Sequence, residues 1–571
     1  MAKEVDKKER ILIIGGVAGG ASSAARSRRL NEEAEIIVFE KGAFVSFANC
    51  GLPYYVGDVI EEEKNLLVAT PELFQKRFNI EVKLRHEVLR IDKTAKTLKV
   101  KDLNSGHEYE EAYDKLVIAT GANAIRPPLP GIDNQGIFTV RTIPESRQIK
   151  QWLTGASVKK ACVVGGGFIG LEITENLINR GIEVTLIDKG PQLLAPLDAE
   201  MTAELESRLV KQGVKILLEE GVQEFKKSSG ESALTVSTDT GKSIEADLVI
   251  LGVGVKPNSA LAKEAGLTVG PTGGIVVSPQ MQTSDPHIWA VGDVTENANF
   301  VTGEQGVVAL AGPANRQGRI AADNIAGKGR TYRGTQGTAV CGVLGLTAAA
   351  TGANEKTLKR LGVEFEKVYL HPGHHVGYYP NAKPIHMKVL YAKGDGRVLG
   401  AQALGEEGID KRIDVIAMTI QLGGTIYDLE EAELCYAPQY GAAKDPINVA
   451  GMIAANERRG DAPLHHWTDL EDKSTGGSSY FILDVRNPSE YDPDHVEGAY
   501  NIPLHDLRER LEELPRDKKI LVYCRVGQRG YYAVRVLRIN GFDAYNLSGG
   551  IITRKDVVFS RRLSTPVASK S

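Results

Sequence analysis

The chain contains 571 residues, of which 42% are hydrophobic and 25% charged, with a formal net charge of −4. These values are those of an ordinary soluble globular protein, and the length predicts about three to four domains. The small net charge excludes a chain-wide attraction to nucleic acid or to an anionic membrane, so any anion site must be a local cluster. No apolar stretch approaches the roughly 20 residues of a membrane span, and the N-terminus lacks the apolar core of a signal peptide. Five scattered cysteines, an odd number, predict free thiols and a cytoplasmic protein rather than a disulfide framework.

The first predicted elements are a strand, a glycine loop, a helix and a second strand, over residues 10–40. This order is the βαβ start of a doubly wound sheet. The loop GGVAGG (Gly15–Gly20) departs from the G-x-G-x-x-G pattern because Val17 stands where the middle glycine is expected. Its position between strand and helix still predicts a loop that binds a pyrophosphate, with Glu40 as acceptor for a ribose hydroxyl.

A single cysteine follows this unit, in the segment SFANCGLP (Ser46–Pro53). Gly51 permits close backbone approach to the sulfur of Cys50, and a turn near a helix start would lower the pKa of its thiol. The sequence has no second cysteine a few residues away, so an internal C-x-x-x-x-C disulfide cannot form. The oxidised partner must be a small-molecule mixed disulfide, a persulfide or a sulfenic acid. The alternative is a buried inert cysteine, which the S-F-x-x-C-G context disfavours.

A second strand–loop–helix–strand segment carries the loop GGGFIG (Gly165–Gly170), with Asp188 at the end of its last strand. This loop fits G-x-G-x-x-G, whose glycines let backbone N–H groups reach a pyrophosphate at a helix N-terminus. Asp188 would accept from a ribose 2′-hydroxyl and repel a 2′-phosphate, which favours NADH over NADPH. Lys189 beside it weakens this preference, so NADPH stays possible.

Three further predicted strands end in glycine turns: KLVIATG (Lys115–Gly121), LVILGVG (Leu248–Gly254) and IWAVGD (Ile288–Asp293). Two nucleotide loops about one domain apart, together with these turns, indicate that one nucleotide is FAD. The combination resembles the pyridine nucleotide–disulfide oxidoreductase family, in which the late Gly-Asp holds the ribityl chain of the flavin. The alternative is a pair of unrelated nucleotide-binding domains. The predicted cofactor-binding residues are Gly15, Gly16, Ala18, Gly19, Glu40, Lys41, Thr120, Gly121, Gly165, Gly167, Phe168, Ile169, Gly170, Glu172, Asp188, Gly254, Gly292, Asp293 and Ala311.

Residues 331–455 form a mixed α/β segment without a nucleotide loop, which predicts a structural or interface domain. Here the resemblance narrows to the single-cysteine branch of the family: coenzyme A disulfide reductases, NADH oxidases and NADH peroxidases. In this resemblance, the oxidase and peroxidase members carry a histidine beside the glycine pair of the first loop. This chain has Ala18 at that position. Coenzyme A disulfide reductases use two tyrosines of the partner subunit near the sulfur, and Tyr378 in HHVGYYP and Tyr436 in CYAPQYGAAKD match those motifs.

A tyrosine hydroxyl can hydrogen-bond and protonate a thiolate leaving group, so Tyr378 and Tyr436 are candidate general acids. Tyr379, adjacent to Tyr378, reads as a packing residue, although the sequence leaves an exchange of roles between the two open. Both tyrosine motifs fall in the interface domain. The resemblance therefore implies a homodimer with shared active sites.

Coenzyme A carries a 3′-phosphate and a pyrophosphate, so its site should be locally positive. On the helix after the first loop, Ser22, Arg26 and Arg29 are spaced i, i+4 and i+7 and lie on one face. A solvated helix face is the alternative, but coenzyme A disulfide reductases use matching helix positions, which favours substrate binding. The resemblance adds Ser46, Asn49 and Lys444 as further substrate-binding candidates, and Arg77 is another candidate.

Residues 456–479 are polar, with Gly and Ser near their end, and predict a linker. A new α/β pattern follows, in which LDVRNPSEYDPDHVEGAYNIP (Leu483–Pro503) resembles the rhodanese signature. In YCRVGQRG, the loop N–H groups, Arg525, Arg529 and the helix dipole would stabilise a thiolate or persulfide at Cys524. Low-molecular-weight phosphatase loops resemble this cradle but need a different spacing to a Ser or Thr. The other alternative, a degenerate rhodanese that only binds a partner, is disfavoured by the presence of Cys524.

We therefore expect an α/β protein with two doubly wound nucleotide-binding domains, an α+β dimerisation domain and a C-terminal α/β rhodanese domain. The expected boundaries are 1–120 with 255–330 for the FAD domain, 121–254 for the NAD(P)H domain, 331–455 for the dimerisation domain, 456–479 for the linker and 480–571 for the rhodanese domain. The expected activity is flavin- and NAD(P)H-dependent reduction of coenzyme A disulfide, coenzyme A persulfide or polysulfide through Cys50, with Cys524 carrying sulfane sulfur.

The expected cofactors and ligands are FAD, NADH or NADPH, and coenzyme A as substrate or bound ligand. No metal, nucleic acid or membrane partner is expected. Two alternatives remain: an NADH oxidase, and a redox sensor with a non-catalytic rhodanese module.

Overall fold

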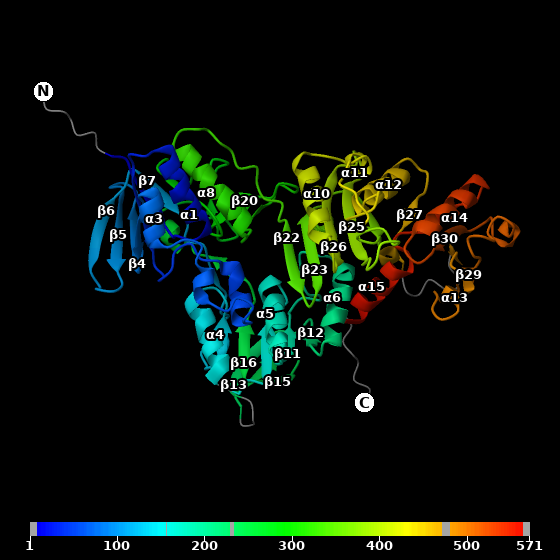
Figure 1. Ribbon diagram of the computed structural model, residues 1–571, viewed down its shortest axis with the longest axis horizontal. Helices are drawn as coiled ribbons and strands as arrows, with labels where there is room; N and C mark the ends of the chain where they lie inside the picture. The colour runs from blue at the N-terminus through cyan, green and yellow to red at the C-terminus, as the bar shows by residue number, and fades with distance from the viewer. Residues whose placement is uncertain (1–7, 156, 229–232, 471–479, 564–571) are drawn as a thin grey trace. The chain divides into compact units, whose positions relative to one another are not determined.

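The computed structural model describes residues 8–155, 157–228, 233–470 and 480–563. The chain divides into two compact units, residues 1–187 with 221–337, and residues 188–220 with 338–571. Figure 1 shows the helices and strands of both units, and the expected mixed α/β class is confirmed. No helix among the described residues is long and apolar enough to cross a membrane.

The first unit contains a parallel sheet in the order β19-β7-β1-β2-β3. Alternate residues of β1 (Arg10–Ile14) and β2 (Glu35–Glu40) enter two hydrophobic cores, one on each face of the sheet. Burial on both faces explains why these strands are continuous apolar runs in the sequence. β19 (Ile288–Ala290) pairs with β7 (Lys115–Ile118), so two distant pieces of the chain share one sheet. The remaining elements of this part are β3 (Glu81–Leu84), α1 (Ala18–Leu30), η1 (Asn49–Gly51), α2 (Leu52–Val56), η2 (Glu63–Leu66), α3 (Pro71–Phe78), α7 (Ala260–Glu264) and α8 (Ala311–Ile325).

A second parallel sheet of the same unit holds β11, β10, β16 and β9 in this order. Its strands and helices are β11 (Glu183–Ile187), β10 (Lys160–Val164), β16 (Leu248–Leu251), β9 (Ile137–Thr139), α4 (Ile143–Gly155) and α5 (Phe168–Asn179). The two sheets therefore repeat one plan, in which a strand, a glycine loop and a helix lead to a second strand parallel to the first. Helices α1 and α8 lie side by side in the first of these layers (Figure 1).

Four small sheets complete the first unit, and each is antiparallel except for the β18–β20 pair. Their strands are β4 (His86–Asp92), β5 (Thr97–Asp102), β6 (Glu108–Ala112), β8 (Ala122–Ala124), β13 (Val222–Lys227), β14 (Leu234–Thr238), β15 (Ser243–Ala246), β17 (Val255–Pro257), β18 (Ile275–Val276), β20 (Thr295–Ala298) and β21 (Gln305–Gly306).

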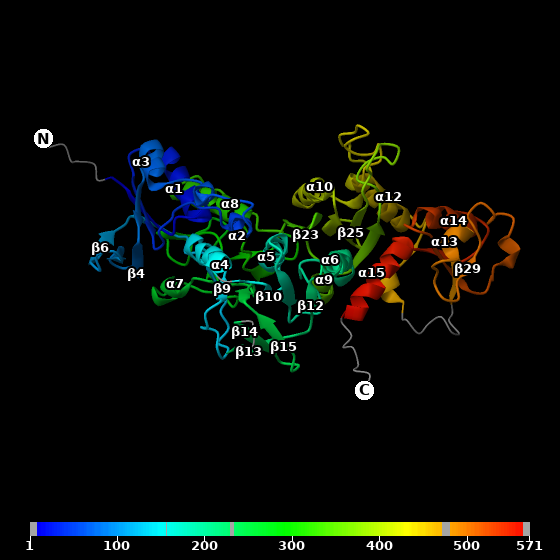
Figure 2. The ribbon, with the colours of Figure 1, turned by 60° about the horizontal axis from the view of Figure 1, so that its bottom comes forward.

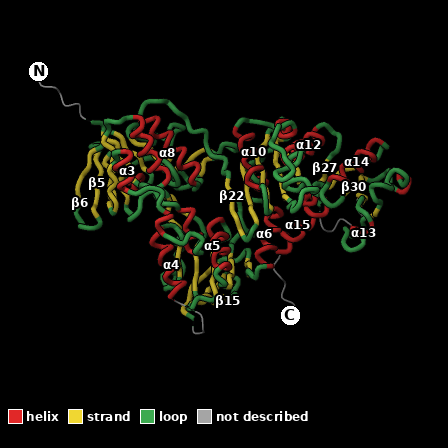
Figure 3. The backbone as a smooth tube through the Cα atoms, in the orientation of Figure 1, coloured by secondary structure: helices red, strands yellow, loops and turns green. Residues whose placement is uncertain are grey.

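The second unit contains an antiparallel sheet in the order β22-β23-β26-β25-β24. Helices α10 and α12 lie against its strands (Figure 3). The elements of this part are α6 (Ala199–Lys211), β12 (Lys215–Leu217), β22 (Ala339–Val343), β23 (Leu346–Gly352), α9 (Glu355–Arg360), β24 (Phe365–Leu370), β25 (Ile385–Ala392), β26 (Val398–Gly405), α10 (Ile409–Gln421), α11 (Ile426–Glu430) and α12 (Pro446–Arg458).

The C-terminal part of the second unit is a parallel sheet in the order β27-β31-β30-β28-β29, which we call the C-terminal sheet. Its elements are β27 (Leu464–His465), η3 (Trp467–Asp469), β28 (Tyr480–Asp484), α13 (Pro488–Tyr491), β29 (Tyr500–Asn501), η4 (Leu511–Glu513), β30 (Lys519–Tyr523), α14 (Gln528–Ile539), β31 (Ala544–Leu547) and α15 (Gly550–Leu563).

The first half of the linker expected over residues 456–479 contains regular structure. β27 pairs with β31, and Trp467 lies buried, with its indole N–H donating to the carbonyl oxygen of Gly550 at 2.7 Å. Polar side chains of this segment bond to neighbouring parts of the protein. A polar sequence alone does not distinguish such a segment from a linker whose side chains are exposed to water. Residues 471–479 of the expected linker lie outside the described residues.

The C-terminal sheet is joined to the antiparallel sheet by direct contacts. Helix α15 packs along α6, as Figures 1 and 2 show from two directions. The backbone N–H of Tyr369 donates to Ser548 Oγ at 3.0 Å, and Lys367 Nζ donates to Thr468 Oγ1 at 2.9 Å. Because α6 packs here, the segment 188–220 groups with the second unit, although the sequence suggested a nucleotide domain over 121–254.

A fully buried lysine lies at the centre of these contacts. Lys388 Nζ lies 2.8 Å from Asp198 Oδ2, 2.7 Å from Glu200 Oε1 and 2.7 Å from Glu355 Oε2, with 0% of its side chain exposed. An ammonium group has three donors, so all of them are used. Lys367 Nζ contributes a second cation, 2.9 Å from Glu355 Oε1. We call these five residues the Lys388 cluster.

The Lys388 cluster should lose stability in acid. Burial alone would raise the pKa of Glu355, but the charges of Lys388 and Lys367 outweigh it and hold the pKa well below its ordinary value of 4.5. A carboxylate with a depressed folded-state pKa contributes its full stability above the ordinary value. That contribution is lost as the pH falls below it.

Lys388→Ala is expected to destabilise the second unit by about 3–5 kcal/mol, because three buried carboxylates lose their cation. Lys359→Ala is the matched control, since Lys359 also pairs with Glu355, at 2.7 Å, but from an exposed position. It should cost less than about 1 kcal/mol. Urea unfolding followed by circular dichroism at pH 7 and at pH 4 measures both, and the two variants should differ less at the lower pH. Equal losses for the two variants at pH 7 would contradict this account.

Candidate active sites

The first glycine loop is packed so closely that two of its positions exclude a side chain. Gly15 has a φ of +95°, and a Cβ there would lie 2.3 Å from the carbonyl oxygen of Ala119. A Cβ on Gly20 would lie 1.8 Å from the carbonyl oxygen of Gly15. Helix α1 begins within the loop, at Ala18, so the N–H groups of its first turn, which have no partner inside the helix, lie at the end of β1. An anion is stabilised at such a position.

The second glycine loop repeats this packing. Gly165 has a φ of +107°, and a Cβ there would lie 2.4 Å from the carbonyl oxygen of Gly252. A Cβ on Gly170 would lie 1.8 Å from the carbonyl oxygen of Gly165, the same distance as in the first loop. A Cβ on Gly167 would meet no heavy atom of the described residues within 4 Å beyond its chain neighbours, so an incoming group can approach there. Both loops therefore fit the pyrophosphate of a dinucleotide.

The two acids that follow these units both bond to backbone N–H groups. Glu40 accepts from Gly16 N at 2.9 Å and from Gly42 N at 2.7 Å, and burial raises the pKa of its carboxyl. A carboxylate has about four acceptor positions, so capacity for a ribose hydroxyl remains. Asp188 directly follows β11 and accepts from Gly190 N at 2.6 Å. Lys41 instead pairs with Glu87, at 2.7 Å.

The other predicted cofactor residues gather at one edge of the first sheet. β1, β7 and β19 are parallel neighbours, so the first glycine loop, the turn after β7 and the turn after β19 lie at the same carboxyl edge. Thr120 Oγ1 donates to the carbonyl oxygen of Asn258 at 2.9 Å, and Gly292 N donates to Gln317 Oε1 at 2.7 Å. Ala311 is the first residue of α8. These groups fit a second nucleotide with an extended chain, such as FAD.

Cys50 lies in η1, directly before α2, and is exposed as a residue. Burial of its sulfur nevertheless raises the pKa of the thiol, and the charges of Glu172 and Asp293 raise this pKa further, against that of Arg141, which lowers it. The backbone at this helix start lowers the pKa of Cys50, as expected, but burial and the two carboxylates outweigh it, so the net shift of the pKa is upward. Glu172 belongs to the helix of the second loop and Asp293 follows β19. The sulfur thus lies where elements from both nucleotide-binding sheets meet.

Glu172 is able to exchange a proton near neutral pH. Burial raises the pKa of Glu172 to about 7, and the hydroxyl of Tyr54 donates to its Oε1 at 3.3 Å. The sequence predicted this residue only as a cofactor contact. Its electrostatic effect on Cys50 depends on the tertiary structure.

Arg141 is a residue that sequence reasoning missed. Its Nη2 lies 2.8 Å from Asp293 Oδ2 and its Nε donates to the carbonyl oxygen of Ala122 at 3.0 Å. It follows β9, a strand of three residues that is too short to stand out as a pattern. Arg141 holds the carboxylate of Asp293 and places a positive charge near Cys50.

The segment before Cys50 is tied to the first glycine loop. Ser46 has a φ of +48°, which is unusual for a residue with a side chain, and its N–H donates to the carbonyl oxygen of Gly16 at 2.8 Å. Asn49 Oδ1 is buried and accepts no hydrogen bond within the described residues. A ligand donor could satisfy it. Arg77 lies exposed in the last turn of α3.

The predicted row on α1 is only partly available to a substrate. Ser22 Oγ bonds to Asn315, and Arg26 forms an ion pair with Asp323 at 2.7 Å, both partners belonging to α8. Arg29 is exposed. The row is therefore not a free cationic face, because α8 supplies polar partners that the local sequence around α1 does not reveal.

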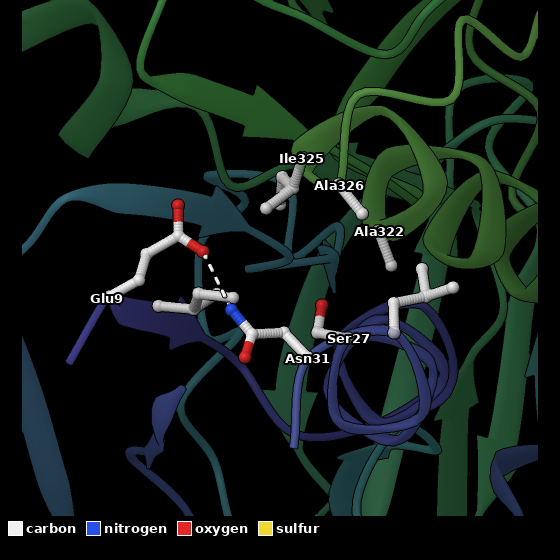
Figure 4. Close-up of a pocket in the computed structure, with 8 residues that line it drawn as sticks. Glu9, Ser27, Asn31, Ala322, Ile325 and Ala326 are labelled. Carbon is white, nitrogen blue, oxygen red and sulfur yellow. Dashed lines mark hydrogen bonds between the residues drawn. The ribbon is translucent and has the colours of Figure 1, made fainter. Parts of the chain in front are cut away.

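A small cavity of about 200 Å³ lies near the opposite end of α1. Figure 4 shows its lining, with Asn31 Nδ2 donating to Glu9 Oε2 at 3.3 Å across one side. Ile325 and Ala326 contribute from the end of α8. None of the predicted site residues lines it.

The two predicted tyrosines meet in the second unit. Their hydroxyls lie 2.8 Å apart, and Tyr378 and Tyr436 are 75% and 46% exposed. Tyr379 instead packs edge-on against the ring of His375, with ring centroids 5.4 Å apart. The two tyrosine-bearing segments are joined by Val376 N, which donates to the carbonyl oxygen of Gly441 at 3.0 Å. Tyr378 is therefore the hydrogen-bond partner of Tyr436, while Tyr379 contacts His375 and is itself 42% exposed.

Arg412 is a second residue that was not predicted. It is buried in α10, where its Nη2 donates to Asp445 Oδ2 at 2.9 Å and to the carbonyl oxygen of His374 at 2.8 Å. Arg412 thereby links the segment that leads to Tyr378 with Asp445. Lys444, the residue before Asp445, is exposed. An arginine on the otherwise apolar face of a helix is a signal that could have identified it.

Cys524 lies buried at the end of β30, before a loop that leads into α14. Gly527, with a φ of +99°, directs its N–H at Cys524 Sγ at 3.2 Å. Such a donor stabilises a thiolate or persulfide. Arg529 is held by Glu490 through two bonds of 2.6 and 2.7 Å, so its charge is shared, while Arg525 is exposed.

Family comparisons agree with this architecture. The chain matches the pyridine nucleotide-disulphide oxidoreductase family over residues 9–318, its dimerisation domain over 338–445 and the rhodanese-like domain over 467–552.

Individual relatives cover most of the chain. A coenzyme A disulfide reductase from Staphylococcus epidermidis is 36% identical over 78% of this chain and 99% of its own length. Among solved structures, the reduced CoADR-RHD of Bacillus anthracis is 44% identical with a TM-score of 0.94, covering 97% of this chain and 98% of that one. A NAD-dependent persulfide reductase from A. fulgidus is 38% identical with a TM-score of 0.88, covering 95% and 99%. The chain therefore belongs to the pyridine nucleotide-disulphide oxidoreductase family and carries a rhodanese-like domain after its dimerisation domain.

Proposed function

We propose that this protein is a flavin-dependent NAD(P)H oxidoreductase that reduces coenzyme A disulfide, coenzyme A persulfide or polysulfide through Cys50. The observation that carries the proposal is the position of this thiol, near Glu172 from one nucleotide-binding sheet and Asp293 from the other. Relatives named for coenzyme A disulfide and persulfide reduction support it. The rhodanese-like domain would carry sulfane sulfur on Cys524.

FAD would be held by the first glycine loop, Glu40 and Asp293, and the nicotinamide dinucleotide by the second loop and Asp188. When bound, FAD supplies two-electron transfer from the reduced nicotinamide to sulfur. The free thiols of all five cysteines suit a reducing compartment, so we place the protein in the cytoplasm.

The chemistry of the chain itself begins with the Cys50 thiolate. It attacks one sulfur of a disulfide or persulfide, forms a mixed disulfide with it and expels the other sulfur as a thiolate. Tyr378 and Tyr436 share a hydrogen bond, so either hydroxyl can give a proton to that leaving sulfur while the other supports it. Two electrons from NADH then return Cys50 to the thiolate and release the bound thiol.

We further propose a homodimer in which the tyrosine pair of one subunit completes the Cys50 site of the other. The match to the dimerisation domain supports this arrangement. The high exposure of Tyr378 in the isolated chain also fits a group that is covered by a partner.

Coenzyme A would be bound through its phosphates. Arg29 and Lys444 are exposed cations, and Ser46 and Asn49 lie beside Cys50 in the sequence. Ser22 and Arg26 would contribute from the same helix as Arg29, with Arg26 remaining paired to Asp323. Arg77 is a further exposed cation.

Cys50→Ser is expected to leave reduction of the bound flavin by NADH intact. Turnover of coenzyme A disulfide should fall by a factor on the order of 10³ or more. The hydroxyl of serine cannot form the mixed disulfide. Stopped-flow absorbance separates the two steps. Cys341→Ala, which removes a buried thiol from the antiparallel sheet, is the control and should retain turnover. Full activity in Cys50→Ser would disprove the role of this cysteine, and oxygen uptake without any disulfide would favour an NADH oxidase.

NADH is expected to be used more efficiently than NADPH by roughly tenfold to a hundredfold in kcat/KM, since a like-charge contact between Asp188 and a 2′-phosphate costs about 1–3 kcal/mol. Asp188→Ser should reduce that ratio. Glu183→Gln, at the exposed start of the same strand, should not change it. A ratio near one in the wild type would show that Lys189 compensates the charge of Asp188.

Cys524→Ser should abolish sulfur transfer from thiosulfate without changing reduction of coenzyme A disulfide, because the two thiols belong to separate domains. A coupled assay, in which NADH oxidation depends on a sulfane donor and catalytic coenzyme A, should fail. Cys50→Ser is the reciprocal control and should keep thiosulfate sulfurtransfer. If Cys524→Ser keeps the coupled activity, the rhodanese-like domain has a non-catalytic role such as that of a redox sensor.

A further inference from the structure

Three side chains with metal-binding chemistry converge where the antiparallel sheet meets helix α15. His371 directly follows β24 and His386 lies in β25, and the pairing of Leu370 with Met387 makes these histidines cross-strand neighbours. Their ring centroids are 4.7 Å apart. Asp556 of α15 reaches the same place, with Oδ2 3.7 Å from His386 Nδ1. One potential ligand atom from each of the three lies within 4.8 Å of the others.

The hydrogen bonds of this cluster are incomplete. His371 Nε2 bonds to Thr553 Oγ1 at 2.7 Å, one turn before Asp556 on the same helix. Its Nδ1 is buried and has no hydrogen-bond partner among the described residues, and the same is true of His386 Nδ1. Buried ring nitrogens are rarely left without a partner. A metal-binding histidine commonly has one nitrogen bonded to an oxygen of the protein and the other to the metal. His371 has the first of these bonds, and its second nitrogen is unpartnered among the described residues.

The carboxylate of Asp556 also differs from the other carboxylates nearby, because it lacks a paired lysine or arginine among the described residues. The acidic cluster of Asp198, Glu200 and Glu355 contains its own cation, Lys388. Asp556, in contrast, pairs with no lysine or arginine of the described chain.

We propose that His371, His386 and Asp556 bind a divalent transition metal ion of the Zn²⁺ class, which fastens helix α15 of the rhodanese-like domain to the dimerisation domain. Two nitrogens and one carboxylate oxygen suit zinc, with water in the fourth position. At bonds of about 2.0–2.2 Å, ligand atoms around zinc lie about 3–4 Å apart, so the three side chains need only a small movement. The site is independent of the proposed catalytic function. It also departs from the expectation, from sequence, that no metal is bound.

Zinc titration of the full-length flavoprotein tests this proposal directly. The protein is stripped with a chelator, dialysed and titrated with Zn²⁺ against a chromophoric competitor. The wild type should bind one equivalent more than His386→Asn and than the near-isosteric Asp556→Asn, or hold that equivalent at least tenfold more tightly. Cys50 and Cys524 can also bind zinc, but they are common to all variants. His495→Gln, in the rhodanese-like domain and bonded only to the Tyr491 carbonyl oxygen at 2.9 Å, is the matched control and should bind as the wild type does.

Thermal stability gives the second measurement. Excess Zn²⁺ should raise the melting temperature of the wild type and of His495→Gln, and should not raise that of Asp556→Asn, because a ligand that binds only the folded state stabilises it. Flavin content and far-ultraviolet circular dichroism establish that each variant is folded. If His386→Asn does not fold, Asp556→Asn decides the outcome. Equal zinc stoichiometry and affinity in all proteins, or no stabilisation of the wild type, would overturn the proposal.

Discussion

The ammonium group of Lys388 is the interaction on which the second unit depends. It is bonded by carboxylates from α6, the segment before it and α9, while Lys388 itself belongs to the middle of β25. A buried charge is costly unless it is fully paired, so the cluster forms only when all of these segments are in place. Lys367 extends it to Thr468, at the start of the rhodanese-like domain. The position of that domain on the dimerisation domain is thus coupled to the folding of the sheet.

The candidate active site of the first unit depends on a different constraint, which is backbone packing. The carbonyl oxygen of Ala119 lies close to Gly15, and that of Gly252 lies close to Gly165, so only glycine fits at either position. The same packing places helix N-termini at the carboxyl edges of two parallel sheets. Cys50 and its charged neighbours are held near those edges, and the result is a thiol whose pKa is raised in the protein alone. A bound cofactor and substrate would have to supply the positive or hydrogen-bonding groups that stabilise a thiolate.

Local sequence patterns predicted the parts of the fold that depend on local geometry. The glycine spacing, the strand ends and the Cys524 loop all carry a physical requirement within a few residues, and they were found. Arg141, Arg412 and Lys388 act through partners more than 30 residues away or through a sheet register, which periodicity does not reveal. The regular structure within residues 456–470 was not predicted for the same reason. The prediction for Thr468 and Trp467 used only the polarity of the local sequence. Their hydrogen-bond partners, Lys367 and the carbonyl oxygen of Gly550, lie far away in the sequence.

The contact surface of β24 has an evolutionary consequence. The Staphylococcus epidermidis relative aligns with 78% of this chain and 99% of its own length, which leaves the rhodanese-like part without a counterpart. In a chain without that domain, the side chain of Lys367 would lack Thr468, and that of His371 would lack Thr553. Selection on these two positions would then be relaxed or redirected toward solubility. Lysine at 367 and histidine at 371 should therefore be inherited together with the fusion.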